Sequence, residues 1–395
     1  MKKLNNPRGM NDKLTDAYQI AAQIEGSIIN TLRLNGFQGI ATPVIEYYEV
    51  FNTDKLRLEE GSVYKLLDRE GNIMALRPDL TVPCARVAAT KLKNAMLPLK
   101  LFYSGSIYRI DSSNENHMEL HQIGAEIFGA DDIWADEQAI MMACDCLKAA
   151  GLKDYSLFLG HAGIFESIKK RLSLSEENEK ELEDIIRKKN LVGLQSFVFN
   201  IEMDEILAKL LLKLPQLFGQ PEKVFSQCSE LYEAAELSDT LDYIKALCIN
   251  LKEHGIAKQI QLDLSIVGGL GYYTGTLFKV YSKGAPGALI SGGRYDSLTE
   301  EFGYECPATG FALYLNQIVH IISQDALHDK DEKHLVIFQK HRSKEAYAYA
   351  NQLRKAGTAA SVVEAGALRD VDGYMAQYGY SKLKIFGREE RVCLK

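Results

Sequence analysis

The amino-acid sequence predicts an α+β protein in which a large sheet domain carries a helical insert and is followed by a small α/β domain. Segments with the period-2 alternation of strands occur before residue 162 and again after residue 256. Residues 162–256 are rich in Leu, Glu and Lys at helical spacing. Residues 334–395 alternate β, α, β, α, β, the pattern of a mostly parallel sheet. We therefore expect a first domain over residues 1–323, with its insert at about 162–256, and a second domain over 334–395.

The composition is that of an ordinary globular chain. Its 395 residues are 46% hydrophobic and 25% charged, enough to bury a sizeable core, and no apolar run reaches the length of a membrane span. The net charge of −7 argues against the broad basic face of a tRNA-binding protein. The seven cysteines form no Cys-x-x-Cys pair, so neither a metal site nor a disulfide framework is predicted. Free thiols and an N-terminus without an apolar signal region indicate a cytoplasmic protein.

The stretch over residues 260–281 organises the rest of the chain. Residues 260–266 alternate as a half-buried strand does, and residues 276–281 follow as a second strand, so we interpret the stretch as a β-hairpin. The turn between the strands holds Gly268, Gly269 and Gly271. Such glycines allow close approach of the backbone to a ligand, and Tyr272 and Tyr273 add rings with polar tips. The pattern fits either an ordinary glycine-rich hairpin or one wall of a binding pocket.

The N-terminal segment predicts a helix, an edge strand and a hairpin. Residues 15–35 form an amphipathic pattern that Thr15 or Asp16 can cap. Residues 38–45 are strand-like but contain Pro43, and because proline donates no ladder hydrogen bond, this strand belongs at an edge or an interface. Residues 61–76 read as two strands around a polar turn, which is the pattern of a hairpin.

Candidate ligand-binding side chains follow the hairpin. Asp79 and Thr81 precede a predicted helix over residues 82–92, where a carboxylate and a hydroxyl could receive an α-ammonium group. The same two residue types also cap helices, and both roles are compatible. Residues 99–107 and 123–128 are predicted to pair as antiparallel strands. The loop between these strands is polar.

Gln122 and Glu126 lie four residues apart, which in a strand places both on one face. There a carboxylate could hydrogen-bond an imidazole ring and favour its protonated form; the alternative is a polar face turned to solvent. Arg109, at the end of the facing strand, could pair either with a ligand carboxylate or with Glu126. Glycines in residues 291–296 could floor a pocket, and Arg294 is predicted to form a structural ion pair.

Four stretches resemble, in order, the histidine-pocket motifs of histidyl-tRNA synthetases. They are LRPDLTVPCAR (76–86), FYSGSIYR (102–109), HQIGAEIFG (121–129) and SGGRYD (291–296), and the resemblance extends from residue 7 to about 319. It implies a class II aminoacyl-tRNA synthetase-like fold, an antiparallel sheet flanked by helices, with the homodimer interface near residues 15–45. It also implies that the C-terminal domain is a shortened form of an anticodon-binding domain, with weak or no tRNA binding. The histidine-binding residues that it implies are Asp79, Thr81, Arg109, Gln122, Glu126, Tyr272 and Tyr273.

The resemblance breaks down where catalysis would occur. Gly268 and Gly271 stand where the synthetases have an arginine and an aspartate. The loop over residues 110–120 lacks the arginines of the synthetase motif, and the third motif has Tyr314, Asn316 and Gln317 in place of Gly, Glu and Arg. Adenylation builds charge on phosphorus that preorganised guanidinium groups stabilise, and losing one such donor typically costs about 10²–10³ in rate. These departures resemble the regulatory subunits of ATP phosphoribosyltransferase, non-catalytic synthetase relatives in histidine biosynthesis.

This second resemblance implies a regulatory subunit with no catalytic residues and no cofactor. It implies a hetero-oligomer with a short catalytic phosphoribosyltransferase subunit and histidine as the allosteric effector. Two alternatives stay open from the sequence. The first is an active histidyl-tRNA synthetase with displaced catalytic residues, which predicts a basic tRNA face and ATP affinity. The second is a stand-alone protein that binds an amino acid or RNA and has no phosphoribosyltransferase partner.

Overall fold

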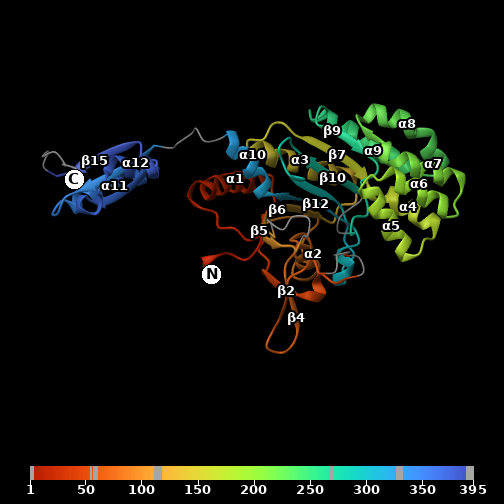
Figure 1. Cartoon of the computed structure of the whole chain (residues 1–395), viewed down its shortest axis with the longest axis horizontal. Coiled ribbons are helices and arrows are strands. Elements are labelled where there is room, and N and C mark those ends of the chain that lie inside the picture. Colours follow the sequence, from red (N-terminus) through yellow and green to blue (C-terminus); the bar gives the residue numbers. More distant parts are fainter. Residues whose placement is uncertain are drawn as a thin grey trace. The chain divides into compact units, whose positions relative to one another are not determined.

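The computed structural model describes residues 4–53, 56, 61–110, 118–266, 271–325 and 332–387. The chain divides into two compact units, Met1–Ser323 and Gln324–Lys395 (Figure 1). The predicted turn glycines Gly268 and Gly269 and most of the predicted polar loop, residues 111–117, lie outside the described residues. None of the helices in the described ranges combines the length and the apolar character that crossing a membrane requires.

A nine-stranded sheet forms the centre of the described part of the first unit, in the order β1-β5-β6-β12-β11-β10-β7-β9-β8. The strands are β1 (Gln38–Gly39), β5 (Leu99–Tyr108), β6 (Glu119–Phe128), β7 (Ser156–His161), β8 (Phe218–Gly219), β9 (Ile260–Asp263), β10 (Thr276–Tyr281), β11 (Ile290–Arg294) and β12 (Ala308–Tyr314). From β5 to β7 each neighbour is antiparallel, whereas β1 pairs with β5 and β9 with β7 in parallel. This arrangement confirms the predicted α+β class.

One face of the sheet packs on α1 (Thr15–Leu34) and α3 (Ile133–Ala149), which share an apolar core with β6 and β12. The buried stripe of α1 consists of Ala21, Ile24, Ile28 and Leu32, so the amphipathic helix is confirmed. The predicted cap is wrong. Thr15 and Asp16 already lie inside the helix, Leu14 occupies the capping position, and no side chain caps the helix there.

The predicted hairpin between residues 260 and 281 is wrong, although both of its strands exist. β7 lies between them, parallel to β9 through Leu157↔Ile260 and antiparallel to β10 through Thr276↔His161. β9 also ends at Asp263 rather than at residue 266. The alternation of residues within a short segment does not indicate pairing with a strand some hundred residues earlier in the chain. Here that earlier strand, β7, is the hydrogen-bonding partner of both β9 and β10.

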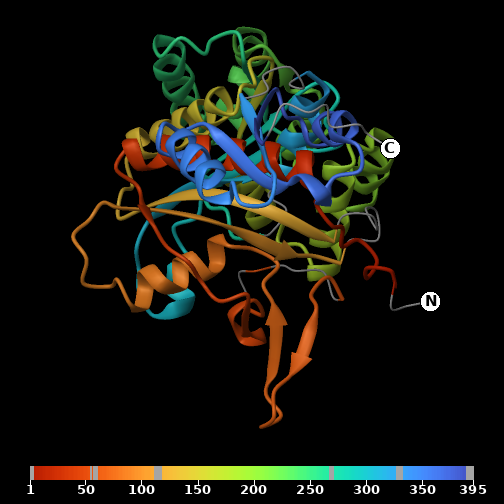
Figure 2. The same ribbon diagram turned by 90° about the vertical axis from the view of Figure 1, so that its left-hand side faces the viewer.

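A second, three-stranded antiparallel sheet extends from the first unit as an arm (Figures 1 and 2). It consists of β2 (Ile45–Tyr47), β4 (Ile73–Leu76) and β3 (Lys65–Leu67), so the predicted hairpin at 61–76 is confirmed. The predicted strand at 38–45 is split into β1 and β2, and Pro43 falls between them. β1 is an edge strand of the large sheet, as expected. After the arm comes α2 (Thr81–Thr90), and after β12 comes α10 (Leu315–Asp325).

Residues 162–253 form a bundle of helices beside the β7–β9 end of the sheet (Figure 1). The helices are α4 (Ala162–Leu172), α5 (Glu176–Arg187), α6 (Leu191–Asn200), α7 (Glu205–Lys213), α8 (Pro221–Ala234) and α9 (Ser238–Glu253). Leu210, Leu247 and other residues of the bundle are buried in the same apolar core as the sheet. β8 pairs with β9, so the bundle and the sheet form one packed body.

The second unit contains a three-stranded parallel sheet, β14-β13-β15, in its described residues. Its elements are β13 (Lys333–Phe338), α11 (Ser343–Lys355), β14 (Ala359–Glu364), α12 (Val371–Tyr378) and β15 (Lys382–Phe386). The predicted β, α, β, α, β pattern is therefore confirmed. The core of this unit is small and centres on Val336, Ala346 and Ala350.

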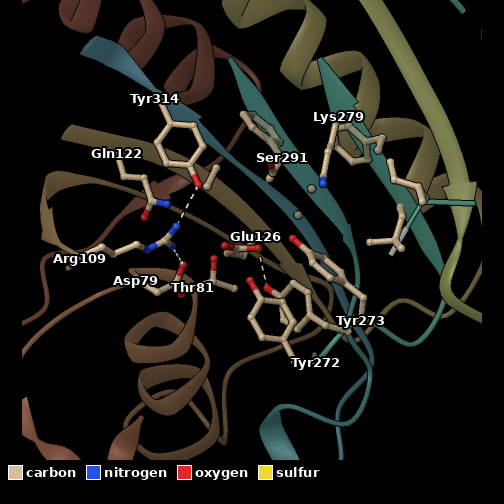
Figure 3. Close-up of a pocket in the computed structure, with 18 residues that line it drawn as sticks. Asp79, Thr81, Arg109, Gln122, Glu126, Tyr272, Tyr273, Lys279, Ser291 and Tyr314 are labelled. Carbon is tan, nitrogen blue, oxygen red and sulfur yellow. Dashed lines mark hydrogen bonds and ion pairs between the residues drawn. The ribbon is translucent and has the colours of Figure 1, made fainter. Parts of the chain in front are cut away.

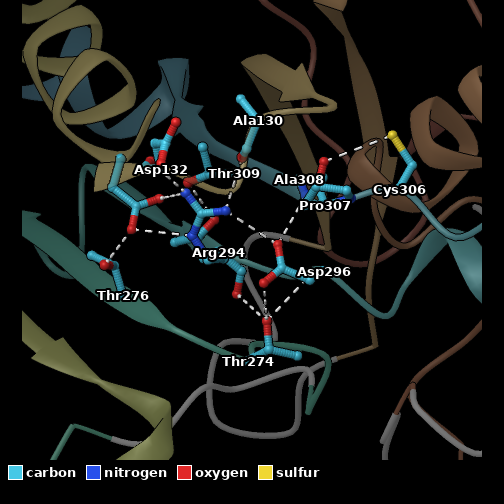
Figure 4. Close-up of polar contacts among 12 residues, drawn as sticks. Ala130, Asp132, Thr274, Thr276, Arg294, Asp296, Cys306, Pro307, Ala308 and Thr309 are labelled. Atoms are coloured by element: carbon cyan, nitrogen blue, oxygen red, sulfur yellow. Dashed lines mark hydrogen bonds and ion pairs between the residues drawn. The ribbon is translucent and has the colours of Figure 1, made fainter. Parts of the chain in front are cut away.

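Arg294 fastens the sheet to its helices (Figure 4). Its guanidinium lies 2.9 Å from Asp136 Oδ1 on α3 and donates to the carbonyl oxygens of Ala130 and Asp132. Asp136 also accepts hydrogen bonds from Thr276 on β10 and from Tyr243 on α9. The predicted structural ion pair is thus confirmed, and it joins two strands, α3 and a helix of the bundle.

We expect Asp136→Ala to lower the free energy of unfolding by about 3–5 kcal/mol, because the mutation leaves the buried Arg294 guanidinium without its counter-charge. Denaturant unfolding followed by circular dichroism measures the change. Asp131→Ala removes a nearby exposed carboxylate and serves as the control, with an expected change within about 0.5 kcal/mol. A loss below about 1 kcal/mol for Asp136→Ala would show that the pair does not fasten the fold.

Candidate functional site

A pocket of about 240 Å³ lies over the middle of the large sheet, on the face that α1 and α3 leave uncovered (Figure 3). This volume is smaller than the roughly 300–1,000 Å³ of pockets that take drug-sized ligands, and it suits a small metabolite. The sequence predicted seven site residues from four separate segments, and all of them line this pocket. They are Asp79, Thr81, Arg109, Gln122, Glu126, Tyr272 and Tyr273.

The pocket exists because glycines occupy the floor of the sheet. The strand register aligns Gly293, Gly310 and Glu126 side by side across three strands. A Cβ atom on Gly310 would overlap the Glu126 carboxylate, and one on Gly293 would overlap the Thr276 carbonyl oxygen and crowd the Tyr273 ring. Gly293 also has a φ of +157°, which side-chain-bearing residues rarely adopt. Glycine is therefore required at both positions for the acidic side chain and the tyrosine ring to fit.

Glu126 is fully buried at the centre of the pocket, and both of its carboxylate oxygens accept hydrogen bonds from tyrosines. Tyr103 donates to Oε1 at 2.8 Å, and Tyr295 donates to Oε2. Tyr103 also contacts the Thr81 hydroxyl at 3.0 Å. Burial raises the pKa of Glu126 to about 8, against the two tyrosine hydrogen bonds, which lower it. Because this pKa lies near neutral pH, the carboxyl can take up or release a proton when a ligand binds.

Asp79 and Arg109 form the second charged group of the pocket. Asp79 Oδ2 lies 3.5 Å from the Arg109 guanidinium, and Asp79 Oδ1 accepts the Val82 amide N–H at 2.9 Å. Asp79 therefore satisfies an amide N–H in the first turn of α2, where Leu80 occupies the capping position, and it also lines the pocket. Burial raises the pKa of Asp79, and the neighbouring Arg109 charge partly opposes this shift.

The sequence left open whether Arg109 pairs with a ligand carboxylate or with Glu126. In the structure Arg109 pairs with Asp79, and no ion pair joins it to Glu126 among the described residues. Its Nε donates to the Pro78 carbonyl oxygen at 2.6 Å, and Nη1 lies 3.5 Å from the Tyr314 hydroxyl. The guanidinium is thus fixed in orientation at the pocket wall. Two of its five N–H groups donate hydrogen bonds within the protein, and Nη2 lies against Asp79.

The remaining predicted residues supply an orphan acceptor and an aromatic wall. Gln122 is buried and lines the pocket, and its Oε1 has no hydrogen-bond partner among the described residues. Buried polar atoms are nearly always paired, so this oxygen is a natural acceptor for an N–H group of a ligand. The rings of Tyr272 and Tyr273 contact each other at an angle of 45° with centroids 4.7 Å apart, and Tyr272 meets Tyr295 edge-on.

Sequence reasoning missed three residues that shape the site. Tyr103 and Tyr295 hold Glu126, and Lys279 enters the pocket from β10. The register could have revealed Tyr103, because it faces Gly124 and therefore shares the pocket face with Gln122 and Glu126. Lys279 carried a signal of its own, since it is the charged residue in an otherwise apolar strand.

The site shows no metal-binding arrangement within the described ranges, where no three His, Cys, Asp or Glu side chains gather as ligands. Six cysteines in these ranges are free and buried, and they are Cys84, Cys144, Cys146, Cys228, Cys248 and Cys306. The polar groups of the pocket are instead two carboxyls, a guanidinium, an amine, an amide and several phenols. Such a set suits a small zwitterionic ligand with hydrogen-bonding atoms of both kinds.

A central antiparallel sheet with an amino-acid-sized polar pocket defines the histidyl-tRNA synthetase-like class. The family model described as histidyl-tRNA synthetase matches residues 9–318. The crystal structure of an ATP phosphoribosyltransferase regulatory subunit/histidyl-tRNA synthetase from Bacillus halodurans superposes with a TM-score of 0.84 at 28% identity, covering 97% of this chain and 98% of the other. Histidyl-tRNA synthetase from Nostoc, at 19% identity and a TM-score of 0.76, shares the fold.

Two relatives by sequence narrow the class further. ATP phosphoribosyltransferase regulatory subunit from Clostridium botulinum is 33% identical over 98% of this chain and 93% of the relative. The protein of the same name from Alkaliphilus metalliredigens is 32% identical over 99% of this chain and 100% of the relative. The chain therefore belongs to the family of ATP phosphoribosyltransferase regulatory subunits.

The raised pKa of Glu126 predicts a pH-dependent stability. Its folded-state pKa of about 8 exceeds the ordinary value of 4.5, so the stabilising contribution is full below about pH 4.5 and is lost as the pH rises through about 8. Glu126→Gln keeps the group neutral at every pH. We therefore expect the unfolding temperature of the variant, relative to wild type, to rise steadily between about pH 5 and pH 9.

Thermal unfolding followed by circular dichroism at several pH values measures this difference. Glu119→Gln, on the outer part of the same strand, controls for the loss of one carboxyl group. A difference between Glu126→Gln and wild type that stays constant across the pH range would mean that Glu126 does not titrate in the folded protein as its burial implies.

Proposed function

We propose that this chain is the non-catalytic regulatory subunit of an ATP phosphoribosyltransferase in the cytoplasm and that its pocket binds L-histidine as the feedback effector. The names of the relatives support the role of the subunit. The observation that carries the ligand assignment is the pocket itself, where Asp79, Glu126 and Arg109 converge within the space of one amino acid. The partner is a short catalytic subunit. This chain forms a homodimer, and the homodimer binds the catalytic partner.

The charges of the pocket fit an amino acid. The α-ammonium group of histidine lies between Asp79 and Thr81 in the proposed pose, near the acceptor oxygen of Gln122. The carboxylate faces the fixed guanidinium of Arg109. The imidazole ring extends past Tyr273 toward Glu126, whose carboxyl can hydrogen-bond one of the ring nitrogens. Each group of the ligand thereby meets a protein group of complementary character.

The same pocket is poorly equipped to handle ATP. Two cationic side chains line it among the described residues, Arg109 and Lys279, and Arg109 already serves Asp79 and Pro78. The sequence contains neither Arg nor Lys from residue 110 to 147, and no arginine from 189 to 293. Stabilising a transferring phosphoryl group requires several preorganised cations or metal ions. This shortage supports a role in sensing histidine without activating it.

Regulation follows from linkage between the pocket and the assembly. A ligand that binds one quaternary state more tightly shifts the population toward that state, and the catalytic partner responds to the shift. A tRNA has no part in this role. The net charge of −7 and the mixed charges of the helical bundle support that exclusion.

The proposal predicts that histidine inhibits the reconstituted complex through this pocket. ATP phosphoribosyltransferase activity is measured with the short catalytic subunit from the same genome, with and without this chain. We expect activity to depend on the chain and to fall when histidine is added. In Asp79→Ala and Glu126→Gln, the inhibitory histidine concentration should rise roughly tenfold to a hundredfold, because each change removes a charge-assisted hydrogen bond.

Calorimetric titration of the same variants with histidine separates binding from assembly, and Glu70→Ala in the exposed turn of the arm is the matched control. If histidine inhibits and binds both pocket variants as it does wild type, the effector site lies elsewhere. If the catalytic subunit neither binds the chain nor responds to it, the regulatory role itself is wrong.

A further inference from the structure

Lys279 is a charged side chain at the far end of the pocket from Arg109. The register places it in one row with Ser291 and Ala312 on the pocket face of the sheet. It lines the pocket, and Figure 3 shows its amine directed inward from β10 on the side of Tyr273 and Ser291. Its neighbours in the strand, Phe278 and Val280, point into the apolar core on the other face.

The charge of Lys279 is not neutralised by a partner within the described residues. No ion pair or hydrogen bond engages its amine there, and burial lowers its pKa. Asp263 on β9 is the carboxylate that acts on it, but Asp263 is held by Lys189 at 2.9 Å and by the Ser265 hydroxyl. Arg187 opposes the charge further. Lys279 is partly buried. An amine held there without a partner is unfavourable in the empty protein, so its placement is best accounted for by a ligand that supplies an acceptor.

Lys279 and Glu126 approach the same space from opposite sides. The register separates them by three strands and two residues, so their Cα atoms are on the order of 15 Å apart. Both side chains rise from the same face of the sheet, and the residues between them on that face are Gly293, Gly310, Ala312 and Ser291, which have a small side chain or none. Lys279 and Glu126 both line the pocket of about 240 Å³ above this floor.

We propose that Lys279 is a specificity-determining residue that donates a hydrogen bond to one imidazole nitrogen of bound histidine while Glu126 accepts from the other. This inference rests on the proposed function and deepens it. A neutral imidazole has one N–H donor and one nitrogen acceptor, whereas the protonated ring has two donors. A carboxylate on one side and an ammonium on the other therefore select the neutral ring. This replaces the sequence expectation that Glu126 favours the protonated form.

The test uses the full chain and compares Lys279→Met with Lys283→Met, an exposed lysine in the turn after the same strand. Calorimetric titration with histidine should show affinity reduced roughly tenfold to a hundredfold in Lys279→Met and unchanged in Lys283→Met. The ligand β-(2-thienyl)alanine keeps the ring size and lacks both ring nitrogens. Its affinity should be unchanged or higher in Lys279→Met, because it offers the amine no acceptor.

Proton release gives a readout that a structural role would not alter. In wild type at pH 7 the ring stays neutral and the Glu126 proton leaves to solvent on binding. In Lys279→Met that proton moves to the ring, which then faces the carboxylate alone. Titrations in buffers of different ionisation enthalpy should therefore show about one proton fewer released by the variant. Other ionisable groups also face the ligand, namely Asp79, Tyr103, Tyr273 and Arg109. Because both proteins contain them, their contributions to proton release cancel in the difference.

Thermal unfolding checks that Lys279→Met folds, with a midpoint no lower than that of wild type, since a partly buried amine without a partner has been removed. Independently of any variant, wild type should bind histidine at least roughly tenfold more tightly than thienylalanine. Equal histidine affinity and proton release in Lys279→Met and wild type would overturn the Lys279 inference and leave the proposed function standing. Failure of wild type to bind histidine at all would overturn both.

Discussion

The buried carboxyl group of Glu126 is the constraint on which the site depends. Two tyrosines hold its oxygens, a glycine on the neighbouring strand leaves room for it, and burial raises its pKa to about 8. An acidic group that is kept dry in this way is costly to ionise unless a hydrogen-bonding or cationic ligand arrives. The site is therefore organised so that ligand binding and the ionisation of one carboxyl are coupled. We propose that this coupling favours a nitrogen-containing ligand.

The strands and helices beneath the pocket explain how ligand binding can affect distant parts of the protein. Arg294 follows the glycine floor on β11 and fastens that strand to α3 through Asp136, which also receives hydrogen bonds from β10 and α9. Helices of the bundle and the sheet share one apolar core. A ligand that changes the position of β10 or β11 would therefore act on elements that reach the surface. Such rigid connections are a physical means by which a bound effector biases a quaternary state.

Much of the site could be predicted from the sequence because its residues occur in short motifs whose order and spacing are specific. Asp79, Gln122 and Glu126 belong to segments where a strand or a helix start fixes the direction of the side chain. Local pattern left a cap or a solvent-facing surface as alternatives, and the resemblance of the motifs assigned these residues to a pocket. The pairing of β9 and β10 could not be predicted in this way. Their true partner, β7, lies far earlier in the chain, and a pattern of alternation does not identify which strand accepts which hydrogen bonds.

The same limit explains the missed residues. The contacts of Tyr103 and Tyr295 with Glu126 become apparent only when the register of four strands is known. Lys279 reaches the pocket because Gly293, Gly310 and Ala312 leave its floor open. The predicted cap of α1 was wrong because sequence pattern determines helix boundaries poorly. Thr15 lies one position too far into the helix to cap it. Local chemistry was thus predictable, and the long-range pairings that bring it together were not.

Histidine-dependent exchange of pyrophosphate into ATP tests most directly the central claim that this pocket holds an amino acid but does not activate it. The purified chain is assayed with ATP, magnesium and saturating histidine, beside an active histidyl-tRNA synthetase as the positive control. The account predicts that histidine binds and that no exchange above background occurs. Exchange at a rate comparable with that of the synthetase would contradict it.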